Sequence, residues 1–288
     1  MKTSFKLGDF ELFWLNGGEF ALDGGAMFGV VPKALWQKKY PADADNCIPL
    51  VAWPILVRTQ KHLVLIETGL GNKLNDKQKK IYRIRKDWSL TEELAVLGIR
   101  REDISHVIQT HFDWDHAGGV IMQNAAGGLE LTFPKARHIL QQKEWDDVLN
   151  PNSRTVNTYW PVNNELLHGK ENLELLNGDR EIVPGISVIH TAGHNSGHQI
   201  VRIESQGELA LHLGDLLPTH AHSNPLWVMA YDNYPLDAIR LKEEWIRKGI
   251  ASKAWFTFYH DPFMQACRFD EKGNVIEKWP EVCQGDAE

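Results

Sequence analysis

The sequence predicts an α+β protein that folds as a single domain over residues 1–288. Short apolar runs typical of buried strands recur along the chain, and several end in histidine or aspartate. Segments with helical signals lie between these runs, and no linker, low-complexity tract or repeat divides the chain. A chain of 288 residues with 43% hydrophobic and 24% charged residues is sufficient for a sizeable core.

The N-terminal part of the chain is expected to be rich in β-strands. Residues 5–22 alternate apolar and polar side chains around an Asn-Gly-Gly segment at 16–18, which predicts a β-hairpin. The glycine-rich segment 23–32 is expected to be a loop, either a hydrophobic plug for the core or a lid that faces substrate. A second strand pair is expected over residues 48–58 and 61–67.

Helical signals appear between the strands. The basic run 73–88 is interpreted as the solvated face of a helix. Ser-Leu-Thr-Glu at 89–92 has the pattern of a capping box, which predicts a short helix that ends near Leu97. Residues 144–149 predict another helix, and the Asn- and Pro-rich segment 150–170 is expected to be an ordered loop insertion.

The composition excludes several classes of protein. A net charge of −7 disfavours a nucleic-acid partner, and no apolar run approaches the roughly 20 residues that span a membrane. The first residues lack the apolar core of a signal peptide, and the three cysteines show no paired spacing, so a cytoplasmic protein with reduced thiols is expected. The eleven tryptophans and eleven phenylalanines suggest that some aromatic side chains line a pocket.

The densest group of chemically active side chains follows the apolar run 106–108. Four metal-capable residues lie within six positions: His111, Asp113, Asp115 and His116. In an extended segment alternate side chains can converge, while Phe112 and Trp114 point elsewhere. Imidazole nitrogen and carboxylate oxygen suit zinc, iron or manganese, and the lack of a thiolate argues against a closed structural zinc site. A solvated polar loop is the alternative, but such density after a buried strand is unusual.

Later apolar runs also end in candidate ligands. Residues 186–189 precede a segment that contains His194 and His198, residues 209–213 precede Asp215, and His260 follows another run. A carboxylate at the end of a buried strand needs a cation or hydrogen-bond donors, because its desolvation otherwise costs several kcal/mol.

In this order, the motifs resemble those of the metallo-β-lactamase fold hydrolases. The five motifs are Glu-Thr-Gly-Leu-Gly at 67–71, His-Phe-Asp-Trp-Asp-His at 111–116, Thr-Ala-Gly-His-Asn-Ser-Gly-His at 191–198, Gly-Asp at 214–215 and His-Asp-Pro at 260–262. The sequence departs from the family in having Glu67 for an aspartate, Asp113 for the second histidine and Ala192 for a proline. Segments 22–33, 147–152 and 227–232 also resemble the lactonase-like (YtnP-like quorum-quenching) branch.

The resemblance implies a four-layered αβ/βα sandwich, in which two mixed β-sheets are flanked by helices and metals bind at one edge. It implies two divalent metal ions, zinc in the first place and iron or manganese as alternatives. By this resemblance His111, Asp113 and His194 hold one ion and Asp115, His116 and His260 hold the other. Asp215 bridges the two ions, and Glu67 and His198 orient ligands.

The resemblance further implies a hydrolase that opens a lactone, or cleaves a related ester, through attack of a metal-bridging hydroxide. Asp115 is the candidate to carry the proton to the leaving group. Candidates for contact with a small-molecule substrate that carries an acyl chain are Met27, Phe28, Trp114 and Tyr231, although each is also compatible with the core. Leu216-Leu217-Pro218 occupies the place where related lactonases often have a tyrosine, and Tyr231 and Tyr234 are the candidates to replace it. His220 and His222 are further candidates for substrate contact. A homodimer is compatible with these observations.

Two other functions remain open from the sequence. Diiron oxidoreductases of the same fold also place a carboxylate at the second ligand position, although they carry an additional flavin domain. A ligand binder without catalytic activity is the other alternative, but seven intact ligand positions disfavour it.

Overall fold

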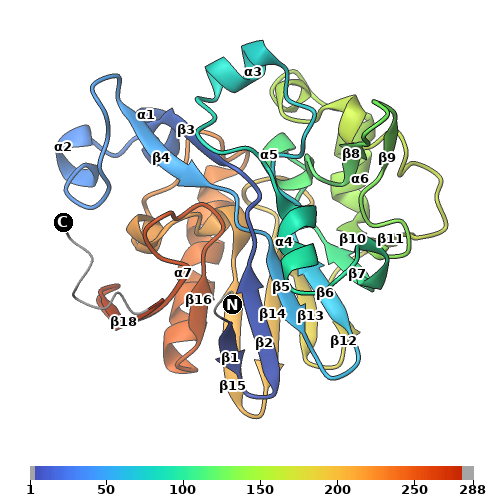
Figure 1. Cartoon of the computed structure of the whole chain (residues 1–288). Helices are drawn as coiled ribbons and strands as arrows, with labels where there is room; N and C mark the ends of the chain where they lie inside the picture. The colour runs from blue at the N-terminus through green and yellow to red at the C-terminus, as the bar shows by residue number, and fades with distance from the viewer. Residues whose placement is uncertain (1–3, 281–288) are drawn as a thin grey trace.

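The computed structural model describes residues 4–280 and contains two seven-stranded mixed β-sheets packed face to face (Figure 1). The first sheet has the order β1-β2-β5-β6-β7-β10-β11, in which β6, β7, β10 and β11 run parallel. Its strands are β1 (Phe5–Leu7), β2 (Phe10–Trp14), β5 (Ile55–Arg58), β6 (Leu63–Ile66), β7 (His106–Ile108), β10 (Arg137–Gln141) and β11 (Leu173–Leu176).

The second sheet follows chain order from β12 to β18. Strands β12 to β15 pair antiparallel with one another, as do β16 to β18, and the parallel pair of β15 and β16 joins the two groups. The strands are β12 (Arg180–Val183), β13 (Ile186–His190), β14 (Gln199–Ser205), β15 (Glu208–His212), β16 (Trp255–Thr257), β17 (Ala266–Phe269) and β18 (Val275–Trp279).

Alternation along the strands explains the layers. In β2, Leu12 and Trp14 point into a cluster shared with strands of the second sheet, whereas Phe13 packs beneath α4 (Leu90–Val96) on the outer face. On the second sheet, Leu211 belongs to the same hydrophobic cluster as Leu241 of α7 (Pro235–Ala251). These clusters define helix, sheet, sheet and helix, and the predicted four-layered sandwich is confirmed.

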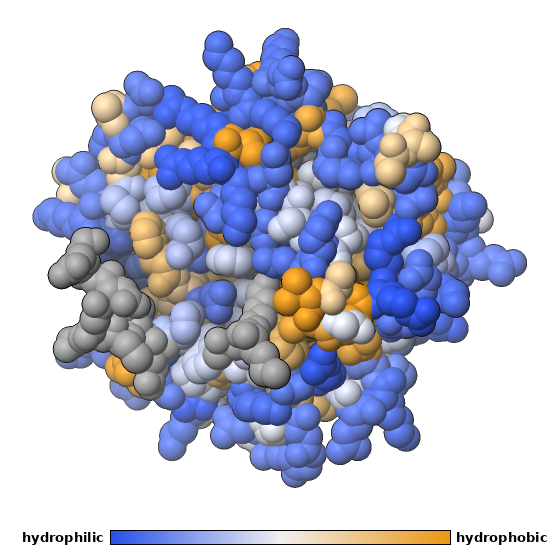
Figure 2. All heavy atoms as spheres, viewed as in Figure 1, coloured by the Kyte–Doolittle hydropathy of each residue, from blue (hydrophilic) through white to orange (hydrophobic). Residues whose placement is uncertain are grey.

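The remaining elements lie outside the two large sheets. They are α1 (Gly24–Phe28), α2 (Lys33–Trp36), α3 (Asp76–Ile81), α5 (Trp114–Ala117), α6 (Gln142–Leu149) and two small sheets, β3 (Glu19–Asp23) with β4 (Cys47–Val51) and β8 (Ile121–Gln123) with β9 (Leu129–Leu131). On the face shown in Figure 2, hydrophobic residues form only small patches among hydrophilic ones. None of the helices within residues 4–280 has both the length and the apolar character that a membrane crossing requires.

The predicted hairpin over residues 5–22 is wrong. β2 pairs with β1 and β5, whereas β3 leaves the first sheet and pairs with β4. The Asn-Gly-Gly segment does not form a tight turn but runs beside Ala52. The Gly17 amide donates a hydrogen bond to the Ala52 carbonyl, and the Ala52 amide donates one to the Gly18 carbonyl. The predicted strand 48–58 is correspondingly divided into β4 and β5.

The capping box at Ser89 is also wrong, although the helix it predicted is present as α4. The Ser89 side chain makes no capping hydrogen bond and instead accepts one from Asn16 Nδ2 at 2.7 Å. A long-range contact therefore replaces the local one. The helix predicted at 144–149 is confirmed as α6, and the predicted loop 23–32 contains the one-turn helix α1.

Candidate metal centre

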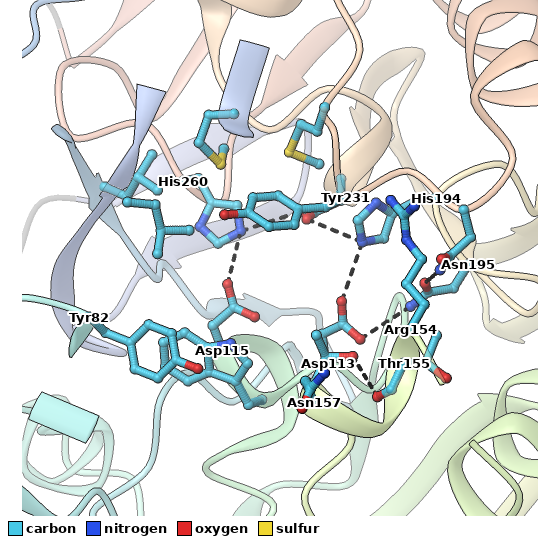
Figure 3. A pocket seen from close by; sticks show the side chains of 18 residues that line it. Tyr82, Asp113, Asp115, Arg154, Thr155, Asn157, His194, Asn195, Tyr231 and His260 are labelled. Atoms are coloured by element: carbon cyan, nitrogen blue, oxygen red, sulfur yellow. Dashed lines mark hydrogen bonds and ion pairs between the residues drawn. The ribbon is translucent and has the colours of Figure 1, made fainter. Parts of the chain in front are cut away.

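The predicted ligands gather at one edge of the two sheets, where four strands end. His111 and Asp113 follow β7, and Asp115 and His116 lie on the short helix α5. The other three, His194, Asp215 and His260, follow β13, β15 and β16 of the second sheet. Each half of the chain therefore contributes part of one cluster (Figure 3).

The first group of candidate ligands is His111, Asp113 and His194. Asp113 Oδ2 lies 3.6 Å from His111 Nε2 and 3.4 Å from His194 Nε2. Both Nε2 atoms are buried and have no hydrogen-bond partner among the described residues. Because an unpartnered buried nitrogen is costly, these atoms fit a cation that accepts their lone pairs.

The second group is Asp115, His116 and His260. The two Nε2 atoms of the histidines face each other at 3.1 Å, and Asp115 Oδ2 lies 3.6 Å from His260 Nε2. Two facing ring nitrogens need a shared proton or a cation between them. A divalent cation near this point fits their chemistry, and the nearby carboxylate would offset its charge.

Asp215 lies between the two groups. Its Oδ1 is 3.3 Å from Nε2 of both His116 and His260, and its Oδ2 is 3.6 Å from His194 Nε2. One carboxylate oxygen therefore faces each group. This arrangement matches the bridging position that the family resemblance implies for this residue.

The four histidines of the cluster use Nδ1 for orientation and direct Nε2 toward the centre. His194 Nδ1 lies 2.9 Å from Asp232 Oδ1, and His260 Nδ1 lies 3.0 Å from the Val51 carbonyl. His116 Nδ1 lies 3.3 Å from Glu67 Oε1, while His111 Nδ1 meets the Thr110 hydroxyl at 2.9 Å. Carboxylate and carbonyl partners favour a proton on Nδ1, which leaves Nε2 free to bind a metal.

Burial and neighbouring charges shift the pKa values of the cluster's side chains in different directions. Burial opposes the charged form of His116, yet Asp215 and Glu67 raise its pKa well above the ordinary value. Burial and the neighbouring histidines lower the pKa of His111. Burial also raises the pKa of Asp115. Because metal binding needs neutral imidazoles, loading of the cluster should release protons.

Sequence reasoning missed several polar neighbours of the cluster. Asp232 lies 38 positions after the histidine that it orients, in a loop without periodicity. Asn195 Nδ2 lies 3.4 Å from Asp113 Oδ1 and 3.3 Å from Glu144 Oε1. Glu144 Oε1 also accepts hydrogen bonds from the Phe112 amide and the Tyr159 hydroxyl, both at 2.9 Å.

Glu144 gives a prediction about the pH dependence of stability. Burial, the largest cause, raises its pKa from 4.5 to about 7. The folded state therefore retains a proton that the unfolded chain loses, and the free energy of unfolding should fall as the pH rises from about 4.5 to 7. The shift corresponds to about 3 kcal/mol.

Urea unfolding of metal-free protein at pH 5 and pH 7.5 measures this contribution against the Glu144→Gln variant. Relative to the variant, the native protein should lose about 2–3 kcal/mol between the two pH values. Parallel pH dependence of the two proteins would show that Glu144 stays ionised in the fold. Asp146→Asn, on the exposed side of the same helix, is the matched control.

A cavity of about 290 Å³ opens onto the cluster. Its size is at the lower end of the range for small-molecule sites. Met27, Trp114 and Tyr231 line it, together with Leu22, Leu50, Tyr82, Asp113, Asp115, Arg154, Thr155, Asn157, Thr158, His194, Asn195, Asp215, Met229, Asn233 and His260. The insertion 150–170 thus supplies part of the polar wall.

Phe28 does not line this cavity. Its ring is fully buried and stacks between Trp36 at 4.9 Å and His222 at 4.5 Å. His222 is also buried and absent from the lining. His220 is partly buried, lies outside the lining and pairs with Asp261 at 2.5 Å. Neighbouring positions on α1 therefore differ: Met27 reaches the cavity, while Phe28 packs in the core.

Trp114 stands between two candidate ligands and is held by aromatic stacking. Its ring stacks on Tyr82 at 4.0 Å and on Trp160 at 5.1 Å, with interplanar angles of 27° and 16°. The stack joins the ligand segment to the end of α3 and to the insertion. It restricts the backbone from which Asp113 and Asp115 project.

Comparison with known proteins identifies the family. The sequence profile of the metallo-β-lactamase superfamily matches residues 48–249. The chain therefore belongs to this superfamily of metallo-hydrolases. A probable metal-dependent hydrolase from Staphylococcus aureus is 41% identical, with 95% of this chain and 98% of that chain covered and a TM-score of 0.89.

A second solved structure is more distant in sequence. AidC, a dizinc quorum-quenching lactonase in complex with a product, N-hexanoyl-L-homoserine, is 21% identical, with 98% of this chain and 97% of that chain covered and a TM-score of 0.80. At this identity the similarity shows the fold alone.

Curated relatives include an N-acyl homoserine lactonase from Bacillus cereus. It is 26% identical over 171 residues, which are 56% of this chain and 61% of the relative. The chain thus spans about three fifths of the length of the lactonases it matches. A probable metallo-hydrolase from Mycobacterium tuberculosis is 28% identical over 218 residues, 66% of each chain.

Proposed function

We propose that this protein is a dinuclear metal-dependent hydrolase that opens a lactone or cleaves a related ester. The observation that carries the proposal is Asp215, whose two oxygens face two separate His/Asp groups. The lactonases among the relatives favour lactones and esters as the substrate class. Residues 1–288 are proposed to act as a single domain.

Two divalent ions, zinc in the first place and iron or manganese as alternatives, would supply Lewis acidity toward a carbonyl oxygen and acidify a water molecule. His111, Asp113 and His194 would hold one ion, Asp115, His116 and His260 the other, and Asp215 both. Carboxylate and carbonyl partners at Nδ1 keep three of these histidines oriented. The protein's contribution is therefore a fixed donor set at the floor of a narrow cavity.

Asp115 is proposed to transfer the proton to the leaving oxygen. Its carboxylate lies at the cavity floor, where it can accept a proton and pass it to a leaving oxygen bound in the cavity. Tyr259 holds this segment by donating its hydroxyl hydrogen to the Asp115 carbonyl at 2.7 Å.

Tyr231 is proposed to contact the substrate from above the cluster. Its side chain crosses the cavity between His194 and His260 (Figure 3). A phenol hydroxyl there can donate a hydrogen bond to a substrate oxygen. This residue would serve in place of the tyrosine that is absent near Leu216, while Met27 and Trp114 supply apolar surface for an acyl chain.

A panel of lactones, carboxylic esters and phosphodiesters tests the proposed class. Purified protein is stripped of metal, reloaded with zinc, manganese or iron, and assayed for each substrate at equal metal content. We expect turnover of lactones or esters in the loaded form and none in the stripped form. Full metal content without turnover of any class, combined with stabilisation by a lactone, would instead indicate a ligand binder.

The replacement at Asp113 predicts the metal preference. Three carboxylates, those of Asp113, Asp115 and Asp215, would face the two ions, one more than with a histidine at position 113. Oxygen ligands favour harder ions than nitrogen ligands do. We expect Asp113→His to shift the Mn/Zn affinity ratio toward zinc by about tenfold or more. Competition titrations followed by elemental analysis measure this ratio; zinc alone at full occupancy in both proteins would contradict the prediction.

A further inference from the structure

The cavity above the candidate metal centre has two chemically different sides. Tyr82 lies on one side, whereas Arg154, Thr155 and Asn195 lie on the other (Figure 3). The apolar lining comes from β3, α1, β4 and the loop before α7. Apart from the candidate ligands, most of the polar lining comes from the insertion 150–170. A ligand that fills the cavity therefore meets an apolar and a polar surface at once.

Arg154 is the cation of the polar side. The only other charged groups in the lining are the three aspartates and two histidines of the candidate centre. No carboxylate of the described residues pairs with the Arg154 guanidinium. Its charge is thus uncompensated by the protein at the mouth of the cavity, where the residue is exposed.

The guanidinium is nevertheless held in place. Its Nη2 donates to the carbonyl oxygens of Ala230 and Asp232, the second at 3.3 Å. The backbone below it is fixed by Asn152, whose Oδ1 accepts hydrogen bonds from the amides of Arg154 at 2.8 Å and Thr155 at 3.1 Å. Nε and Nη1 make no hydrogen bond to another described residue, so two oriented donor groups remain for a ligand.

We propose that Arg154 determines specificity for substrates in which the scissile ester separates an apolar chain from an oxyanion. This inference rests on the proposed function and names the substrate class of that site. Two divalent ions would carry four positive charges, which the three carboxylates beneath them and a metal-bound hydroxide would balance, so Arg154 would remain the uncompensated cation of the loaded cavity. A guanidinium with free donors binds a carboxylate or phosphonate by charge-assisted hydrogen bonds.

Matched esters test the proposal by turnover. Hexanoyl glycolate carries a carboxylate, and hexanoyl glycolamide carries a neutral amide of similar size. In each, water adds its oxygen to the acyl carbon, the ester bond breaks, and the released alcohol takes the proton. We expect kcat/KM to favour the anionic ester in the native protein, and Arg154→Gln to lower this preference about 10–100-fold.

The neutral ester serves as an internal reference. Loss of the hydrogen bonds from Arg154 to the carbonyls of Ala230 and Asp232 would slow the hydrolysis of both substrates equally. Arg154→Lys keeps the charge and should retain part of the preference. Lys170→Gln removes a positive charge from the same insertion outside the cavity and should leave the preference unchanged. An anionic-to-neutral ratio that is the same in native protein and Arg154→Gln would overturn the proposal.

Binding measurements separate this proposal from the proposed hydrolysis. Three analogues replace the ester by a stable amide: the anions N-hexanoylglycine and N-hexanoylaminomethylphosphonate and the neutral N-hexanoylglycinamide. Calorimetry with metal-loaded protein gives their affinities. Tighter binding of either anion, lost in Arg154→Gln, supports the proposal even if no ester is cleaved, and the better anion identifies the oxyanion. Equal affinities, or an anion preference that persists in Arg154→Gln because the metals bind the anion, would refute it.

Discussion

Replacement of Asp215 by alanine should lower kcat/KM of the metal-loaded protein for the proposed ester or lactone substrates by at least about a thousandfold. The residue faces both groups of candidate ligands, so its loss weakens both ion positions, and Lewis-acid stabilisation is worth several kcal/mol. The bound metal should fall below two ions per chain. Elemental analysis and initial-rate kinetics measure the two effects.

Asp215→Asn is the sharper variant, because it keeps the size of the side chain and removes its charge. It should lose metal as Asp215→Ala does. Asp147→Ala removes a carboxylate on α6 that bonds Ser196 and lies outside the cavity lining, and it should retain both ions. Two ions and native rates in Asp215→Asn would show that this carboxylate does not bridge.

Replacement of Trp114 by alanine should destabilise the metal-free protein by about 3–5 kcal/mol, the usual cost of deleting a buried aromatic side chain. Trp114 is 5% exposed and stacks on both Tyr82 and Trp160, whose rings also lie 6.1 Å apart, so the three rings form one cluster. The deletion removes the most buried ring of this cluster and leaves a void beside the ligand segment. Urea unfolding followed by circular dichroism measures the loss.

Trp114→Phe keeps an aromatic ring in the stack and should cost less than half as much. Trp160→Ala removes another ring of the cluster and should also cost less, since Trp160 is only partly buried. A loss below about 1 kcal/mol in Trp114→Ala would mean that Tyr82 and Trp160 shift to fill the space and that the aromatic cluster does not support the fold.

The candidate ligands could be predicted from the sequence because each follows a short apolar strand. Strand ends of a sheet converge at an edge, so local motifs such as Gly214-Asp215 specify a position as well as a residue type. The order of the motifs then distinguished one fold from other αβ arrangements. The structure brings all seven residues together, and their binding of metal stays a prediction.

Strand pairing was less predictable, because it depends on distant partners. Residues 16–18 have turn chemistry, but Ala52 supplies hydrogen bonds that compete with a local hairpin. Ser89 failed as a cap for the same reason, since Asn16 reaches it across 73 positions. In both cases a tertiary contact outweighed a local preference.

The cavity walls were the least predictable part of the molecule. Arg154 and Asp232 lie in segments without periodicity, so nothing in their neighbours indicates which way they face. Met27 and Phe28 are adjacent and chemically similar, yet the single turn of α1 directs one to the cavity and the other to the core. Such choices are made by three-dimensional packing.

The candidate metal ligands come from both sheets, and this division has a consequence for how long the protein persists in the cell. Ions held by His116, from the first half of the chain, and by His260, from the second half, would link the two halves of the sandwich. Ligands that bind only the native state stabilise it by mass action. The supply of these metals in the cell would then determine how well the folded protein resists proteases. Starvation for the metals should shorten the lifetime of the polypeptide as well as abolish its activity.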